Sequence, residues 1–216
     1  MTPIESFLAE LDEQNRAALE RIGAAAACEP GGDVTVAKLL QLAMKNELEA
    51  TECAASWIGT TPEIDVKLAF ARQAGDEARH YRLIEKRLRE LDVDARLLDP
   101  AGRSPMFAYL TSLGTTVERV AAGQFTREAL AIVRNEEFVR FCEDRNDVAT
   151  AILYREVIQP DERHHHELGR RLLSTLVVSE AARSAVLAAA QRTLALAEEL
   201  QEIARMRFGI SRAPGC

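Results

Sequence analysis

Apolar residues recur along most of the chain at the three- and four-residue spacing that gives an α-helix one buried face. No stretch shows the strict alternation expected of a half-buried β-strand. Turn-forming residues divide the pattern at 30–33, 59–62, about 92–104, 143–147 and 175–179. The pattern therefore predicts an all-α protein with helices over about 2–27, 35–58, 62–91, 105–141, 148–173 and 179–208.

Each of the four middle helices carries ionisable residues in the middle of its apolar stripe. Burial of an unpaired carboxylate costs several kcal/mol, so four buried glutamates need compensating positive charge. We expect that charge to come from Arg79, from Arg163 or from a bound cation. The residues that interrupt the stripes are Glu47, Glu77, His80, Glu128, Glu162 and His165.

Four of these residues form two Glu-x-x-His units, and each unit follows an aspartate. The segments are Asp-Glu-Ala-Arg-His at 76–80 and Asp-Glu-Arg-His-His at 161–165. Residues three apart share one face of a helix, so the carboxylate and the imidazole of a unit can bind one metal centre. A single match is common by chance in acidic helices, whereas two in comparable contexts indicate a metal protein.

Positions relative to the helix turns select the glutamates that can meet. In an antiparallel helix pair, residues equidistant from the turn lie at the same height. Glu47 lies about 14 residues before Thr61 and Glu77 about 16 after it, while Glu128 and Glu162 are each about 17 residues from position 145. Each pair is therefore expected to be level.

Other carboxylates on the same helices fail this selection. Glu136 and Glu137 would lie roughly 12 Å from the height of Glu162 at 1.5 Å per residue, and Glu118 misses in the other direction. Glu49 and Glu52 occupy other faces of their helix. We expect all of these side chains to lie on solvated helix surfaces.

The segment between the second and third middle helices, about 13 residues, can extend roughly 40 Å and so cross the length of a bundle. Two helix hairpins joined by such a crossover, with these six residues in this order, resemble the ferritin-like di-iron carboxylate superfamily over residues 35–173. The resemblance implies a four-helix bundle in which Glu77 and Glu162 bridge two metals. Glu47 and His80 would complete one site, and Glu128 and His165 the other.

By the same resemblance, Asp76 and Asp161 would be the hydrogen-bond acceptors that orient the two imidazoles. Carboxylate-rich sites with two imidazoles suit iron, with manganese or a mixed iron and manganese pair as alternatives, and the ligand types do not exclude zinc. Two iron ions are the expected cofactor. The metal ligands are the only catalytic residues that the sequence suggests.

Within this superfamily the sequence resembles the branch that contains rubrerythrins and bacterial di-iron monooxygenases. Storage ferritins normally lack the second complete Glu-x-x-His unit, which is present here. The resemblance implies an oxidoreductase that activates dioxygen to oxidise or hydroxylate a small organic substrate, with electrons from a separate reductase. A ferroxidase or peroxide scavenger without an organic substrate is an alternative, and a metal-free structural subunit is another.

Length, charge and composition restrict the domain organisation, the partners and the cellular location that we expect. The 216 residues suit one domain, and the outer helices, about 2–27 and 179–208, would cover the bundle or form a homodimer contact. A net charge of −7 offers no basic surface, which disfavours nucleic-acid binding. The four cysteines show no Cys-x-x-Cys spacing. With no apparent signal peptide and no run of 18 apolar residues, we expect a cytoplasmic protein without membrane contact.

Several further residues stand near the expected ligands. Pro160 should kink or bulge its helix and so re-aim Glu162. His164 and His166 flank His165 and are expected to be mainly exposed. Four aromatic residues could line a substrate cavity, although core packing is the simpler interpretation: Trp57, Tyr81, Phe125 and Tyr154.

Overall fold

The computed structural model describes residues 2–27, 34–95, 102–210 and 213–215, and every regular element in these ranges is a helix. The all-α prediction is confirmed. No helix in the described part of the chain combines the length and apolar character that crossing a membrane requires. The expected turn at 30–33 and much of the expected connection at 92–104 lie outside the described residues.

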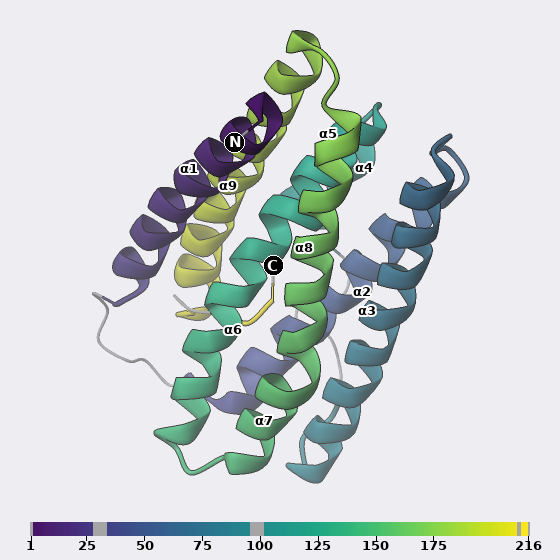
Figure 1. Ribbon diagram of the computed structural model, residues 1–216. Coiled ribbons are helices and arrows are strands. Elements are labelled where there is room, and N and C mark those ends of the chain that lie inside the picture. The colour runs from purple at the N-terminus through teal and green to yellow at the C-terminus, as the bar shows by residue number, and fades with distance from the viewer. Residues whose placement is uncertain (1, 28–33, 96–101, 211–212, 216) are drawn as a thin grey trace.

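The first hairpin consists of α2 (Val36–Ile58) and α3 (Ile64–Glu90). Thr35 begins α2 as its N-cap, because its hydroxyl accepts a hydrogen bond from the backbone N–H of Lys38. The two helices pack along their length and join at the end of the bundle opposite the turn between α6 (Glu128–Glu143) and α7 (Val148–Leu153) (Figure 1). This hairpin matches the predicted helices over 35–58 and 62–91.

The second hairpin is built from shorter segments that follow one another with little break. After the turn at 143–147, Asp147 caps the next helix by accepting a hydrogen bond from the backbone N–H of Thr150. The outgoing arm consists of α5 (Thr116–Arg119), the π-helical segment η1 (Val120–Arg127) and α6 (Glu128–Glu143). The returning arm consists of α7 (Val148–Leu153), the π-helical segment η2 (Tyr154–Ile158) and α8 (Gln159–Leu176).

The prediction of a single helix over 105–141 is wrong. The chain forms α4 (Pro105–Ser112) and becomes extended at Leu113. A new helix then begins at Thr116, with Thr115 as its N-cap. Thr115 and Glu118 form a reciprocal capping box, in which each side chain bonds the backbone N–H of the other residue. These local hydrogen bonds compete with helix continuation, although the apolar spacing continues across the break.

The two π-helical segments stand directly before the ligand-bearing helices α6 and α8. The bulge expected at Pro160 is present as η2, since proline cannot donate the regular backbone hydrogen bond at its own position. The equivalent distortion at η1 contains no proline and was not predicted. Within η1, a Cβ atom added at Gly123 would lie 2.9 Å from the Trp57 ring, so this segment packs unusually close to α2.

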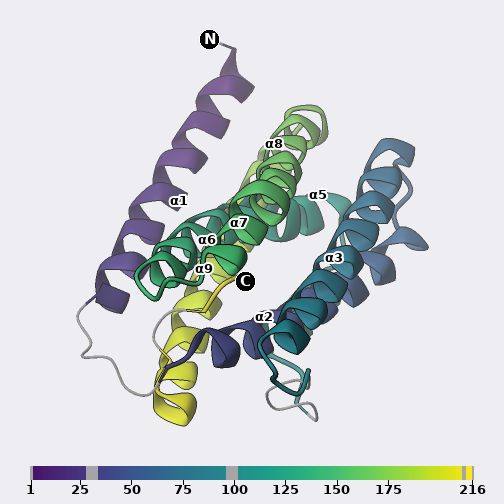
Figure 2. The same ribbon diagram turned by 90° about the horizontal axis from the view of Figure 1, so that it is seen from below.

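The outer helices α1 (Pro3–Ala27) and α9 (Glu180–Phe208) lie on the side of the bundle away from α3 (Figure 2). Helix α9 packs against η1, and α1 packs against α6, α8 and α9. The predicted role of the outer helices as a cover is thus met within the chain.

The buried apolar residues form two clusters separated along the bundle. One contains Trp57, Phe70 and Phe125 and lies toward the turn between α2 and α3. The other contains Ile84 and Tyr154 and lies toward the turn between α6 and α7. On α2, α3 and α8, five of the six interrupting residues predicted from the sequence fall between the positions of these clusters, and the sixth, Glu128, lies at the start of α6. The fold therefore encloses a polar layer between two apolar ones.

Candidate metal centre

The polar layer brings all six predicted residues together. Their potential ligand atoms form two overlapping groups, and the atoms of each group lie within 4.8 Å of one another. Each side chain belongs to a residue that is 3% exposed or less. Glu77 and Glu162 are shared by both groups. Glu47 and His80 complete the first group, and Glu128 and His165 complete the second.

Both imidazoles direct Nδ1 toward the carboxylates. His80 Nδ1 lies 3.5 Å from Glu47 Oε2, 3.4 Å from Glu77 Oε2 and 3.8 Å from Glu162 Oε1. His165 Nδ1 lies 3.9 Å from Glu77 Oε1 and 3.6 Å from Glu162 Oε2. Neither nitrogen has a hydrogen-bond partner although both are buried. Unpartnered imidazole nitrogens surrounded by carboxylate oxygens fit a bound cation, which would accept lone pairs from both.

The other ring nitrogen of each imidazole bonds an aspartate from the opposite hairpin. His80 Nε2 lies 3.0 Å from Asp161 Oδ2, and His165 Nε2 lies 3.1 Å from Asp76 Oδ2. Each aspartate therefore orients the histidine of the other helix and not that of its own. A carboxylate accepting from Nε2–H fixes the tautomer that leaves Nδ1 free to bind a metal.

Burial and mutual repulsion shift the carboxyl pKa values. Burial, together with the negative charges of Glu77 and Glu162, raises the pKa of Glu47 to about 8. Burial likewise raises the pKa of Glu128 well above its usual range, with the same two neighbours adding to the shift. Burial would also raise the pKa of Glu77, but the nearby His80 outweighs it and lowers that pKa. Without a cation the centre therefore retains protons on some carboxylates.

The imidazoles show the complementary shifts. Burial alone would lower the pKa of His165, but the hydrogen bond to Asp76 and the nearby carboxylate of Glu162 raise it to about 11. The pKa of His80 is also raised, because the carboxylates of Glu47 and Glu77 outweigh the effect of burial. An imidazole that binds a metal is neutral, so in the metal-bound centre the charge of the four carboxylates would be balanced by two divalent cations.

Of the three expected sources of positive charge, which were Arg79, Arg163 and a bound cation, the two arginines are wrong. Arg79 contacts the outer carboxylate of Asp161, and Arg163 lies on the surface, 3.1 Å from Glu136. Arg127, which was not among the expected sources, does approach a buried glutamate, because its Nη1 lies 3.9 Å from Glu128 Oε1. In the sequence, the only sign of this contact is that Arg127 directly precedes Glu128.

Gln73 is a site residue that the sequence reasoning did not identify. Its Nε2 donates to Glu128 Oε1 at 2.6 Å and to Glu77 Oε1 at 3.4 Å, so it links the two hairpins. It lies four residues before Glu77 on the same apolar stripe, where a buried amide is unexpected unless it bonds something.

The rejected carboxylates stay outside the two groups of potential ligands. Glu136 pairs with Arg163, and Glu118 belongs to the capping box. The expectation of a solvated surface is wrong for Glu49, which is 8% exposed. Its carboxylate accepts from the backbone N–H of Ser104 at 3.0 Å and from the Ser104 hydroxyl, so it anchors the start of α4.

Three of the four aromatic residues near the centre are buried and belong to the core clusters: Trp57, Phe125 and Tyr154. Tyr81 is half-buried. The hydroxyl of Tyr154 has no hydrogen-bond partner, and burial followed by the charge of Glu47 raises its pKa well above the usual range.

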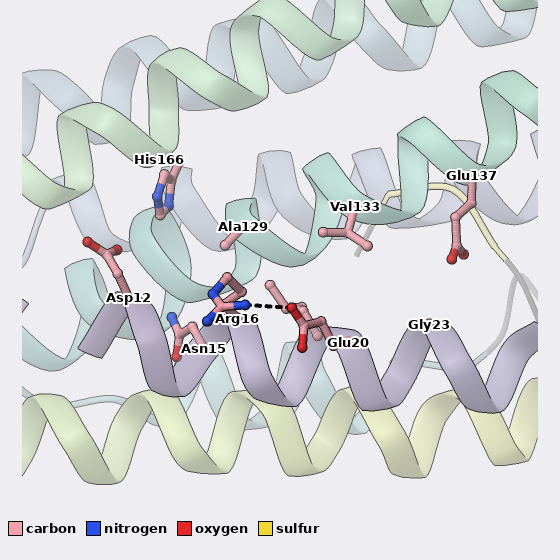
Figure 3. Close-up of a pocket in the computed structure, with 10 residues that line it drawn as sticks. Asp12, Asn15, Arg16, Glu20, Gly23, Ala129, Val133, Glu137 and His166 are labelled. Atoms are coloured by element: carbon pink, nitrogen blue, oxygen red, sulfur yellow. Dashed lines mark hydrogen bonds and ion pairs between the residues drawn. The ribbon is translucent and has the colours of Figure 1, made fainter. Parts of the chain in front are cut away.

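The two histidines beside His165 are both half-buried, so the expectation of exposure is only partly met. His166 donates from Nδ1 to the carbonyl oxygen of Phe125 at 2.7 Å and stacks on the Phe125 ring. It also points into a cavity of about 390 Å³ between α1, α6 and α8, opposite Asp12 (Figure 3). The lining of this cavity includes neighbours of the centre but none of its six potential ligands.

The chain matches no protein-family model, no curated protein and no solved structure. The chemistry of the centre is therefore the basis on which a function can be inferred.

Proposed function

We propose that the chain is an oxygen-activating di-iron oxidoreductase built on a ferritin-like bundle. The observation that carries the proposal is the polar layer itself. Six buried residues form two groups that share Glu77 and Glu162, and the Nδ1 atoms of both histidines have no partner. Two metal positions with two bridging carboxylates would account for the shared residues and for the unpartnered nitrogens.

The donor set favours iron or manganese, because it contains four carboxylates, two imidazoles and no thiolate. When bound, an iron pair would supply the electrons that reduce dioxygen. The protein side chains would orient the ligands and keep water away from the centre. Asp76 and Asp161 hold the imidazoles, and the apolar clusters on either side exclude bulk water from the centre.

The proposed reaction oxidises an organic substrate, which supplies part of the electrons needed to reduce dioxygen. In a hydroxylation, a C–H bond of the substrate would supply two electrons and a separate reductase the other two. With two protons taken up, one oxygen atom would enter the substrate and the other would leave as water. The complete second Glu-x-x-His unit supports this assignment over iron storage. The cost of burying four carboxylates argues against a metal-free structural role.

Oxygen uptake by iron-loaded protein with an external reductant tests this function. Wild-type protein and Glu136→Ala should consume oxygen at similar rates, because Glu136 makes only a surface ion pair worth less than about 1 kcal/mol. Glu162→Ala should abolish uptake, because it removes an oxygen donor from both metal positions. Equal rates in the two variants would contradict the assignment. Uptake that ends once the ferrous iron is oxidised, whatever organic compound is added, would indicate a ferroxidase.

A further inference from the structure

Glu128 and Glu47 are chemically equivalent in the proposed centre, yet Glu128 has a distinctive environment. Oxygen Oε1 of Glu128 accepts the 2.6 Å hydrogen bond from Gln73 and faces Arg127. Oxygen Oε2 is buried and has no hydrogen-bond partner. In the other hairpin, the position four residues before the shared glutamate is Ile158, which cannot donate. Gln73 and Arg127 therefore compete with a metal for Oε1 of Glu128, whereas Oε2 has no competing partner.

A second buried amide lies beside the same position. Gln124 is fully buried, and neither its Nε2 nor its Oε1 has a hydrogen-bond partner. It stands four residues before Glu128, within the π-helical segment that leads directly into α6. It also packs on Gly169, four residues after His165, where an added Cβ would lie 2.9 Å from the Gln124 carbonyl carbon. Gln124 is thus placed one turn from both residues that complete the second group.

Gln73 lies toward the same end of the bundle as Gln124. Helices α3 and α6 run away from the turn between α2 and α3, and α8 runs toward it (Figure 1). Gln73, Gln124 and Gly169 are therefore all displaced from the ligand layer in one direction. An unpartnered buried amide costs about 1–3 kcal/mol, so this side of the layer calls for a polar ligand.

The geometry points to a binding subsite for a small exogenous anion at the metal position of Glu128 and His165. This inference rests on the proposed metal centre. Gln73 is a positioning residue: it holds Oε1 of Glu128, so that Glu128 binds through Oε2 alone and a coordination position stays open. Gln124 Nε2 donates a hydrogen bond to the anion that fills this position. The position of Glu47 and His80 lacks both amides.

Azide titration of the iron-loaded, air-oxidised protein tests the subsite, with the azide absorption band as the readout. Gln124→Leu should weaken azide binding about tenfold or more, the effect of one hydrogen bond to a charged group. It should not lower the melting temperature, because it removes an amide that has no partner in the protein. Gln73→Leu should also weaken azide binding, because Glu128 can then bind through both oxygens and close the position.

Gln159→Leu is the matched control. Gln159 is also a buried amide, but its Nε2 donates to the Ile132 carbonyl oxygen at 2.8 Å. This variant should melt at a lower temperature and bind azide as the wild type does. Bound iron with unchanged azide affinity in Gln124→Leu would overturn the subsite and leave the metal centre intact. Wild-type protein that binds no iron would overturn both. If Gln73→Leu loses iron, the azide affinity of Gln124→Leu alone decides whether the anion subsite exists.

Discussion

At the residue scale, the crossed contacts between aspartates and histidines explain how two hairpins form one centre. Asp161 orients His80, and Asp76 orients His165, so neither imidazole is fixed by its own helix alone. The sequence predicted the aspartates as acceptors but not the crossing, because sequence neighbours on one helix do not reveal which residue of another helix they contact. Gln73 was missed for the same reason.

We predict that Asp76→Ala and Asp161→Ala each lower metal affinity about 10- to 100-fold, because the imidazole that each aspartate orients loses its hydrogen-bond acceptor. Asp65→Ala is the control, since Asp65 is an exposed acid on the same helix as Asp76. Competition with a chelator of known affinity measures the effect. An affinity loss as large in Asp65→Ala would mean that surface charge, and not imidazole orientation, is being measured.

At the element scale, the helices and hairpin pairing could be predicted, because the apolar spacing and the turn residues are local signals. The break at 113–115 and the π-helical segment η1 could not. The segment η1 depends on contacts from elsewhere in the chain, such as the close approach of Gly123 to Trp57. The break is set by the local capping box of Thr115 and Glu118, which the continuing apolar spacing conceals. The π-helical segment η2 was foreseeable because Pro160 carries its cause in the sequence.

Two glycines offer a test of this close packing. Gly169→Ala should destabilise the protein by about 1–3 kcal/mol, because the new Cβ would meet backbone atoms of Gln124 at 2.9 Å. Gly75→Ala should stabilise it by about 0.5–1 kcal/mol, since Gly75 lies within α3 with nothing within 4 Å of the added Cβ. Denaturant unfolding of both variants measures the difference. Similar effects on stability in the two variants would contradict the packing of α8 on η1.

At the scale of the whole molecule, the polar layer between two apolar clusters makes stability depend on pH and on metal together. Glu47 has its pKa raised from 4.5 to about 8, so its contribution to metal-free stability is present below pH 4.5 and is lost as the pH rises through 8. His165 has its pKa raised from 6.5 to about 11, so its contribution is lost as the pH rises through 11.

Metal binding has the opposite dependence, because it requires deprotonated carboxylates and becomes stronger as the pH rises. We therefore predict that the difference in melting temperature between metal-loaded and metal-free protein grows from pH 5 to pH 8. Thermal unfolding of both forms across this range measures it. A difference that stays constant or shrinks would show that the metal does not bind at these carboxylates.

Counting bound iron in single-ligand variants tests the central claim most directly. Anaerobic titration of chelator-treated protein with ferrous iron should give two ions per chain for the wild type. Glu47→Ala and Glu128→Ala should each retain one tightly bound ion, because each removes a residue that belongs to only one of the two groups. A wild type that binds no iron or a single ion, or two variants that both still bind two, would contradict a dinuclear centre in this layer.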